Sequence, residues 1–287
     1  MKSKAVFLFL LVGFFSSTET NAQIDLGEKA MGALQSGVAS FTFTNAEAAK
    51  LSSAAVRKMD STNVVAGPKD GYTLRLNRIF GKHANENGLA LNYKVYLTKD
   101  INAFATADGS VRVFSGLMDI MDDNQLLAVI GHEIGHVANE DTKDAMKAAY
   151  RKAALVGAVS SQSDKIAALT DGQLGQIGNA MLDSRHSRMQ ESEADMYSYD
   201  FMKRNKYDVN AVESAFALLA SQNENAASDF LTRMMSSHPD PKERAEKAKN
   251  RAIADGLYKA YVQKPINNKA VVVKATTKKK ATTKKKK

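Results

Sequence analysis

Two histidines and a glutamate at helical spacing carry the most informative chemistry of this 287-residue chain. His132 and His136 lie four residues apart, with Glu133 between them, in the sequence HEIGH. Side chains four residues apart share one face of a helix, so both imidazoles can bind the same Zn²⁺ ion. Glu133 is then a candidate general base for a water held by that ion. The alternative is a solvated helix surface that matches the pattern by chance.

A zinc hydrolase also needs a third protein ligand and an open coordination position for water. Glu191 and Asp195 lie downstream at the same four-residue spacing, in a stretch whose pattern predicts a second helix. Glu191 can complete the ligand set, and Asp195 can accept a hydrogen bond from the far nitrogen of a ligating histidine. Mixed imidazole and carboxylate sites accept several divalent ions, so zinc is a preference of such a set.

Three motifs in this order resemble the HtpX and CAAX prenyl protease family of zinc metallopeptidases. They are HEIGH, then SRMQESEAD, then His238-Pro239 with Arg244 six residues past the histidine. The likeness extends upstream to residues 102–105 and 109–117 and covers roughly residues 70 to 255. It implies a mainly helical α+β domain of the gluzincin type, with a small β-sheet before the HExxH helix.

The resemblance implies one zinc ion per chain, held by His132, His136 and Glu191. Glu133 would take a proton from water, whose pKa zinc lowers to about 7. Asp195 would orient a ligand histidine.

The resemblance also implies that His238 and Arg244 lie over the metal and stabilise the oxyanion, a contribution worth a few kcal/mol of barrier in other enzymes. In some periplasmic members the equivalent histidine instead coordinates zinc in a latent state. Both roles of His238 stay open.

The helix that carries the histidine pair is predicted to run from about Asn124 to His136 behind an Asp123 cap. Apolar residues at helical intervals predict further helices at residues 45–59 behind an Asn45 cap, 70–85, 210–221 and 242–254.

Alternating polarity predicts two strands of a small sheet, at residues 91–97 and 111–114. An edge strand of that sheet can pair with an extended substrate. Asn102 and Ala103–Ala105 are expected near this groove, with an ordinary turn as the alternative.

Residues 141–183 connect the two metal-bearing helices, and their apolar run at 153–159 is too short to cross a membrane. Three roles stay open for this connector: core packing, a mobile lid or a partner-binding helix. Because the HtpX-like and prenyl protease members are integral membrane enzymes, the chain departs from them here and resembles instead the soluble periplasmic quality-control members of the family. Prenylated substrates and intramembrane cutting are therefore not expected.

The N-terminus has the basic start, the apolar run and the polar end at Ala22 of a secretory signal peptide. Its eleven apolar residues fall short of the roughly 20 that span a bilayer. Since the chain has no cysteine, it lacks disulfides and a lipid-bearing Cys, and the mature protein is expected to be exported, soluble and periplasmic. We expect a signal peptide at 1–22, a lead-in at 23–44, a zinc metallopeptidase domain at 45–258 and a disordered Lys-rich tail at 259–287.

The net charge of +9 equals the nine lysines of residues 269–287, so the other 268 residues are balanced. A tail of this composition cannot bury a core. It can contact an anionic membrane or lipopolysaccharide, and a solvated tail without a partner is the alternative. No nucleic acid is expected as a partner of an exported chain.

His83 and His186 lack ligand spacing and are expected at the surface. Together these features predict an exported zinc metalloendopeptidase that cleaves misfolded or envelope polypeptides in protein quality control. A chaperone or assembly factor for envelope proteins, with a mostly latent zinc site, is the alternative. No pattern specifies an oligomeric state.

Overall fold

The computed structural model describes residues 44–86, 88–156, 166, 169–225 and 237–268. Its helices are α2 (Asn45–Thr62), α3 (Gly71–Phe80), α4 (Ser115–Ile120), α5 (Asp123–Ala138), α6 (Asp141–Val156), α7 (Asp171–Leu182), α8 (Arg188–Arg204), α9 (Asn210–Asn225) and α11 (Pro241–Ala254), with a 3-10 turn, η1 (Gly81–His83). The predicted signal peptide, nearly all of the lead-in and the tail from residue 269 lie outside the described residues. Within the described residues, no helix combines the length and the apolar character that crossing a bilayer requires.

In the part of the chain that the structure describes, five short strands form two sheets ahead of the histidine-bearing helix α5. A hairpin pairs β1 (Asn85–Glu86) with β2 (Leu89–Ala90), and a second sheet has the order β3 (Asn92–Tyr96), β5 (Ser110–Phe114), β4 (Ala103–Ala105). β5 runs parallel to β3 and antiparallel to β4. Both predicted strands are therefore confirmed, and the turn expected as an alternative at Ala103–Ala105 is the edge strand β4.

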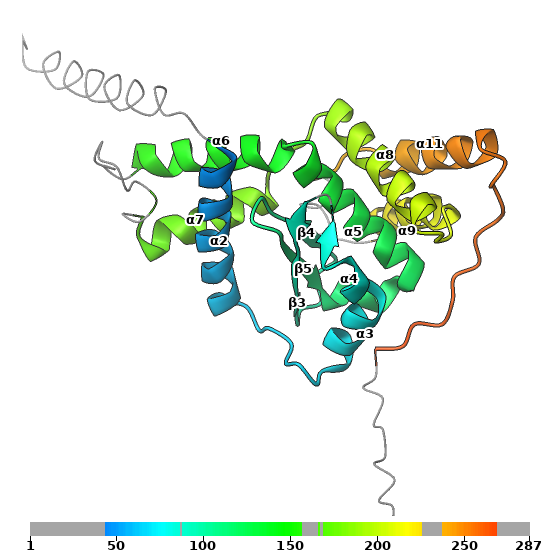
Figure 1. Cartoon of the computed structure of the whole chain (residues 1–287), viewed down its shortest axis with the longest axis horizontal. Helices are drawn as coiled ribbons and strands as arrows, with labels where there is room; N and C mark the ends of the chain where they lie inside the picture. Colours follow the sequence, from blue (N-terminus) through cyan, green and yellow to red (C-terminus); the bar gives the residue numbers. More distant parts are fainter. Residues whose placement is uncertain (1–43, 87, 157–165, 167–168, 226–236, 269–287) are drawn as a thin grey trace, which may run out of the picture.

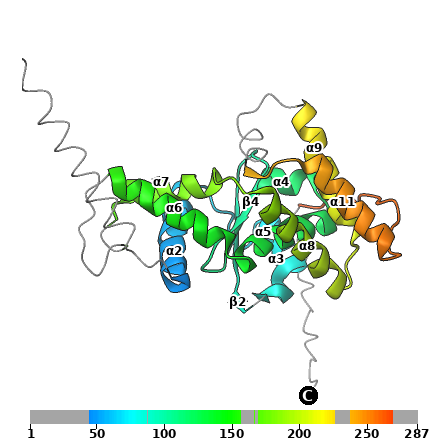
Figure 2. The same ribbon diagram turned by 90° about the horizontal axis from the view of Figure 1, so that it is seen from above.

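The helices gather on two sides of the three-stranded sheet and α5. Helices α2, α6 and α7 lie together on one side, and α8, α9 and α11 lie on the other in both views (Figures 1 and 2). The main apolar core joins the sheet, α5, α8, α9 and α11, and a second cluster joins α2, α6 and α7. A mainly helical domain with a small sheet before the HExxH helix is thus confirmed.

The connector between the metal-bearing helices folds as α6 and α7 against α2. Met146, Tyr150 and Ile177 are buried in the cluster that also holds Leu51. This agrees with core packing for this part of the connector. The side chains of the apolar run 153–159 lie outside the described residues.

The caps of two helices differ by one residue from the prediction. Asp122 caps α5, because its carboxylate accepts the backbone N–H groups of Asn124 and Gln125 while the Gln125 side chain accepts that of Asp122. Asp123 instead pairs with Arg75 and Arg78, so the predicted Asp123 cap is wrong. Likewise Thr44, and not Asn45, caps α2 in a reciprocal pair with Glu47.

The chain beyond α11 crosses the molecule as an extended strap, residues 257–268, drawn in orange in Figure 1. The Tyr261 hydroxyl donates to Asp122 at 2.7 Å, and the Lys264 backbone N–H donates to the same carboxylate at 2.8 Å. Arg75 donates to Asn268 at 2.8 Å. Residues 259–268, which we expected to belong to a disordered tail, therefore contact the folded domain, with hydrogen bonds to the starts of α5 and α9 and to α4.

Candidate metal centre

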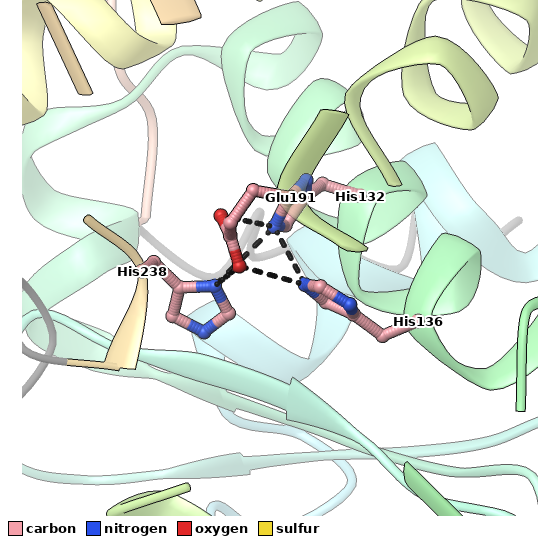
Figure 3. Close-up of side chains that lie close together, drawn as sticks. All are labelled: His132, His136, Glu191 and His238. Atoms are coloured by element: carbon pink, nitrogen blue, oxygen red, sulfur yellow. Dashed lines mark hydrogen bonds and ion pairs between the residues drawn. The ribbon is translucent and has the colours of Figure 1, made fainter. Parts of the chain in front are cut away.

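Four side chains from three parts of the chain converge on one point (Figure 3). His132 and His136 come from α5, Glu191 from the first turn of α8, and His238 from the residues just before α11. One ligand atom from each lies within 4.8 Å of every other. The structure thus brings together the three predicted ligands and adds His238 to them.

Close packing of α5 on α8 brings the histidines to Glu191, and the two glycines of GHEIGH permit it. A Cβ on Gly135 would lie 2.9 Å from the Cα of Ala194, and one on Gly131 would lie 3.1 Å from the Phe201 ring. Ser198 also donates to the Ala128 carbonyl across the two helices. Larger residues at the glycine positions would push the helices apart and separate the ligands.

The imidazoles are oriented by carboxylates on their far sides. His132 Nδ1 lies 2.9 Å from Asp195 Oδ1, and His136 Nδ1 lies 2.8 Å from Asp141 Oδ2. We assign the protons to these Nδ1 atoms, because each carboxylate needs a donor. Both Nε2 lone pairs then face the centre, where they lie 3.0 Å apart.

This donor set fits a zinc ion. Glu191 oxygens lie 3.3 Å from His136 Nε2 and 3.6 Å from His132 Nε2. Tetrahedral Zn²⁺ with bonds of about 2.0–2.1 Å separates its ligand atoms by about 3.3 Å. Three acceptors that face one another at this separation repel unless a cation or a shared proton lies among them.

Burial and neighbouring charges set the protonation of the cluster. Burial and the nearby Arg244 lower the pKa of His132 to about 3, which keeps its ring neutral and able to ligate. Burial alone would raise the pKa of Glu191, but the charge of His238 and a hydrogen bond from His136 hold it well below its usual range. Burial would lower the pKa of His136, yet Asp141 and Glu191 raise it to about 9. A proton on this ring therefore competes with a metal ion.

A family comparison agrees with this geometry, because the model of peptidase family M48 matches residues 72–252. The chain belongs to peptidase family M48. The metalloprotease LoiP of Escherichia coli (strain K12) is 39% identical over 230 residues, which cover 79% of this chain and 90% of LoiP. The metalloprotease YcaL of the same organism is 37% identical over 253 residues, 87% of this chain and 98% of YcaL.

The likeness to HtpX is also confirmed, at 33% identity to the protease HtpX of Nitrosococcus oceani over 90 residues, 30% of each chain. This M48 protein is accordingly a zinc metalloprotease in which His132, His136 and Glu191 form the metal-binding cluster.

The M48 general base candidate, Glu133, lies beside the cluster without joining it. Its Oε1 is 3.9 Å from His238 Nε2, and the residue is 7% exposed. Burial raises the pKa of Glu133 against the opposing charges of His238 and His136. A carboxylate with a raised pKa can take and return a proton near neutral pH.

Arg244 lies behind the ligands of this M48 site. Its Nε and Nη2 donate to Asp195 at 2.9 and 2.7 Å, and Nη1 lies 2.6 Å from Glu191 Oε2. Its guanidinium also covers the Phe216 ring at 4.1 Å. All three nitrogens of the guanidinium contact the carboxylates of Asp195 and Glu191. This geometry agrees better with a role of Arg244 in positioning these two carboxylates than with the oxyanion contact that the resemblance implied.

Sequence analysis did not single out Asp141, and it assigned His186 to the surface instead of to the site. Asp141 is buried, holds His136 and accepts from Gln190 at 2.9 Å. The sequence holds a signal for Asp141, which is an acid five residues past His136 and lies just beyond the end of α5. His186 is half-buried and stacks on His136 with ring centroids 3.8 Å apart.

The prediction that His83 and His186 lie at the surface is wrong. His83 is 5% exposed, with its ring 4.8 Å from that of Phe201 and its Nε2 2.7 Å from the Tyr207 hydroxyl. A buried ring whose nitrogen has a polar partner is explained without a metal. The burial of His83 was not predictable from local sequence, because Phe201 and Tyr207 lie more than 100 residues away along the chain.

Proposed function

We propose that this M48 metalloprotease is an exported endopeptidase that hydrolyses misfolded or envelope polypeptides. The observation that carries the proposal is the convergence of the Nε2 atoms of His132 and His136 and the Glu191 carboxylate beside the buried Glu133. The envelope role is supported by the predicted signal peptide. It is supported also by 30% identity over 180 residues to the β-barrel assembly-enhancing protease of Escherichia coli (strain K12), which cover 59% of this chain and 36% of that protein.

When bound, Zn²⁺ would supply a Lewis acid that polarises a peptide carbonyl and acidifies water. Glu133 takes the proton of the attacking water at its carboxylate and returns it to the leaving amine. Asp195 and Asp141 hold the two ligand rings with their Nε2 lone pairs toward the centre. Arg244 neutralises Glu191 and Asp195 from behind.

The decisive experiment measures zinc content by mass spectrometry and casein cleavage on the protein from residue 23 onward. Glu133→Gln keeps the side-chain shape but removes the base, so we expect one zinc per chain and cleavage reduced roughly 10²–10⁴-fold. Glu193→Gln, an exposed acid on α8, is the matched control and should cleave like the wild type. A folded protein that binds no zinc would contradict the proposal.

A second candidate function is that of an envelope chaperone or assembly factor with a latent zinc site. His238 supports it, because its Nδ1 lies 3.0 Å from Glu191 Oε1 and 3.4 Å from His132 Nε2, within reach of a shared ion. In this state His238 takes the coordination position that water needs. We expect His238→Ala to cleave casein faster than the wild type while it keeps zinc. Slower cleavage would instead assign His238 to the transition state.

We further propose that the Lys-rich tail binds anionic lipid or lipopolysaccharide surfaces. Its nine lysines have no acidic residue among them to balance their charge. Binding to vesicles that contain an anionic lipid should weaken with salt, because charges are screened beyond about 10 Å at 0.1 M ionic strength. A chain that ends at Asn268 should lose binding and keep cleavage. Equal binding by the shortened chain would refute the proposal.

A further inference from the structure

One face of the metal-binding His136 ring is covered by another imidazole. The ring of His186 stacks on it, with ring centroids 3.8 Å apart and the two planes 17° from parallel. His186 lies in the connection between α7 and α8 and belongs to neither helix. The metal ligands and the general base candidate leave the role of this ring unexplained.

The backbone around His186 is held in place on both sides. Its N–H donates to the Ser237 carbonyl at 3.1 Å. The next residue, Ser187, caps α8, because its hydroxyl accepts the Gln190 N–H at 3.3 Å while the Gln190 side chain accepts the Ser187 N–H. Gln190 also donates to Asp141 at 2.9 Å. The stacked ring is therefore carried by a segment that is fixed to the surroundings of the metal ligands.

The stack supplies a restraint that the other contacts of His136 lack. Its Nδ1 lies 2.8 Å from Asp141, and its Nε2 faces the centre of the cluster. Both contacts lie in the ring plane, so neither resists a tilt of the ring out of that plane, whereas a flat contact on the face does. For His132, the ring contacts within the described residues are all steep, at 66–85°. His136 is thus the ligand whose tilt is set by a stacked neighbour.

The stack is expected to be stronger in the zinc-loaded protein. A cation at Nε2 withdraws electron density from the His136 ring. A ring that carries positive charge attracts the π electrons of the aromatic face above it. An interaction that is stronger in the zinc-loaded state than in the zinc-free state raises the affinity for zinc.

The same stacking argues against a second metal site at this place. His136, Asp141 and His186 offer ligand atoms within 4.8 Å of one another. The lone pairs of an imidazole lie in its ring plane, however, and two stacked, nearly parallel rings cannot both direct a lone pair at one ion. Asp141 is also bonded already to His136 and Gln190.

We propose, building on the zinc-dependent function above, that His186 is a positioning residue whose ring face fixes the tilt of zinc-bound His136 and raises the zinc affinity of the site. The ring nitrogens of His186 are not needed for this role. His186 also lines the pocket that borders Glu133 and Ala103–Ala105. A contact between its nitrogens and a substrate is therefore the alternative that an experiment has to separate from stacking.

Two substitutions separate the ring face from the ring nitrogens. His186→Ala removes both, and we expect zinc affinity, measured with a competing chelator, to fall roughly 2- to 10-fold. His186→Phe keeps an aromatic face and removes the nitrogens, so it should bind zinc like the wild type. Met189→Ala, at a position of α8 that is 69% exposed, is the control.

Two further measurements test positioning as such. The visible spectrum of the cobalt-substituted protein reports the ligand geometry, and it should change in His186→Ala but not in His186→Phe. Urea unfolding with and without zinc should show that His186→Ala loses more stability in the zinc-loaded protein than in the zinc-free protein.

Three outcomes would overturn the proposal. An equal loss of stability with and without zinc, at unchanged zinc affinity, would make His186 a purely structural residue. Weak zinc binding by His186→Phe as well as by His186→Ala would assign the role to the ring nitrogens. A second zinc ion that binds the wild type and not His186→Ala would establish the metal site excluded above. These measurements need no turnover, so a protein that fails to cleave casein would count against the endopeptidase function alone.

Discussion

The half-buried Asp60 and the buried Glu191 are both carboxylates in clusters of charged side chains, and the neighbours of the two carboxylates differ in kind. Asp60 accepts from Arg112 at 2.8 Å, from Lys94 at 2.7 Å and from the Tyr96 hydroxyl at 2.8 Å. Every neighbour of Asp60 is thus a donor. Glu191 instead faces the Nε2 atoms of two rings whose Nδ1 atoms lie against the carboxylates of Asp195 and Asp141.

The difference separates a structural cluster from a site. In the Asp60 cluster, donors and acceptors match, so no further group is required. In the metal cluster, formed by His132, His136, Glu191 and His238, acceptors face acceptors, and Arg244 supplies charge from one side only. The Asp60 cluster should therefore be indifferent to zinc, whereas the metal cluster should depend on it.

The largest expected effect follows from removing the carboxylate of the metal cluster. Glu191→Gln deletes a ligand, so we expect zinc affinity to fall by more than about 100-fold, beyond the 10–100-fold typical of losing an orienting partner. Zinc titration with a competing chelator measures it, with exposed Glu193→Gln as the control. Unchanged affinity would mean that the two clusters do not differ as described.

A smaller effect is expected from the orienting acid that the sequence did not indicate. Asp141→Asn weakens the acceptor for His136 Nδ1–H, and we expect zinc affinity to fall roughly 10- to 100-fold. Asp144→Asn, an exposed acid one turn along α6, is the matched control. If both variants bound zinc like the wild type, Asp141 would be a structural cap of α6 only.

What the sequence predicted well was local. The histidine pair, the four-residue spacing of Glu191 and Asp195 and the strands near residues 92–96 and 110–114 follow from periodicities that neighbouring residues impose. The helix expected at 70–85 ends at Phe80 and continues only as η1 to His83.

The site contacts that the sequence did not predict arise where the chain reverses direction or meets a distant residue. Glu140 has a φ of 63°, which turns the chain at the end of α5 and brings Asp141 back to His136. No periodicity encodes that reversal. Residues 259–268 have a polar composition typical of a tail, and only the three-dimensional position of Asp122 gives Tyr261 a partner.

The Asp60 cluster should respond to pH instead of to metal. Burial alone would raise the pKa of Asp60, but hydrogen bonds from Arg112, Lys94 and Tyr96 outweigh it and lower the pKa from 3.8 to about 2. A depressed carboxyl pKa stabilises the fold above the unfolded value of 3.8, and the contribution disappears as pH falls through about 2. This contribution of Asp60 to the free energy of unfolding is about 2 kcal/mol at pH 7.

Asp60→Asn should therefore lower the free energy of unfolding by about 2 kcal/mol at pH 7, and the gap to the wild type should close between about pH 4 and pH 2. Urea unfolding at several pH values measures both quantities. Zinc should stabilise the variant and the wild type equally. A zinc-dependent gap would show that the two clusters are coupled.

The smallest expected effect concerns the strap, which binds the carboxylate of Asp122 at the start of α5. Asp122 resembles Asp60 in that all its neighbours donate, and Tyr261→Phe removes one of several donors. We expect a loss of about 1 kcal/mol in unfolding free energy, with zinc affinity unchanged. A chain ending at Tyr258 should lose more, because the backbone donor of Lys264 is lost as well. A fall in zinc affinity for Tyr261→Phe would mean that the cap, about three turns before His132 and about four before His136, also positions the ligands.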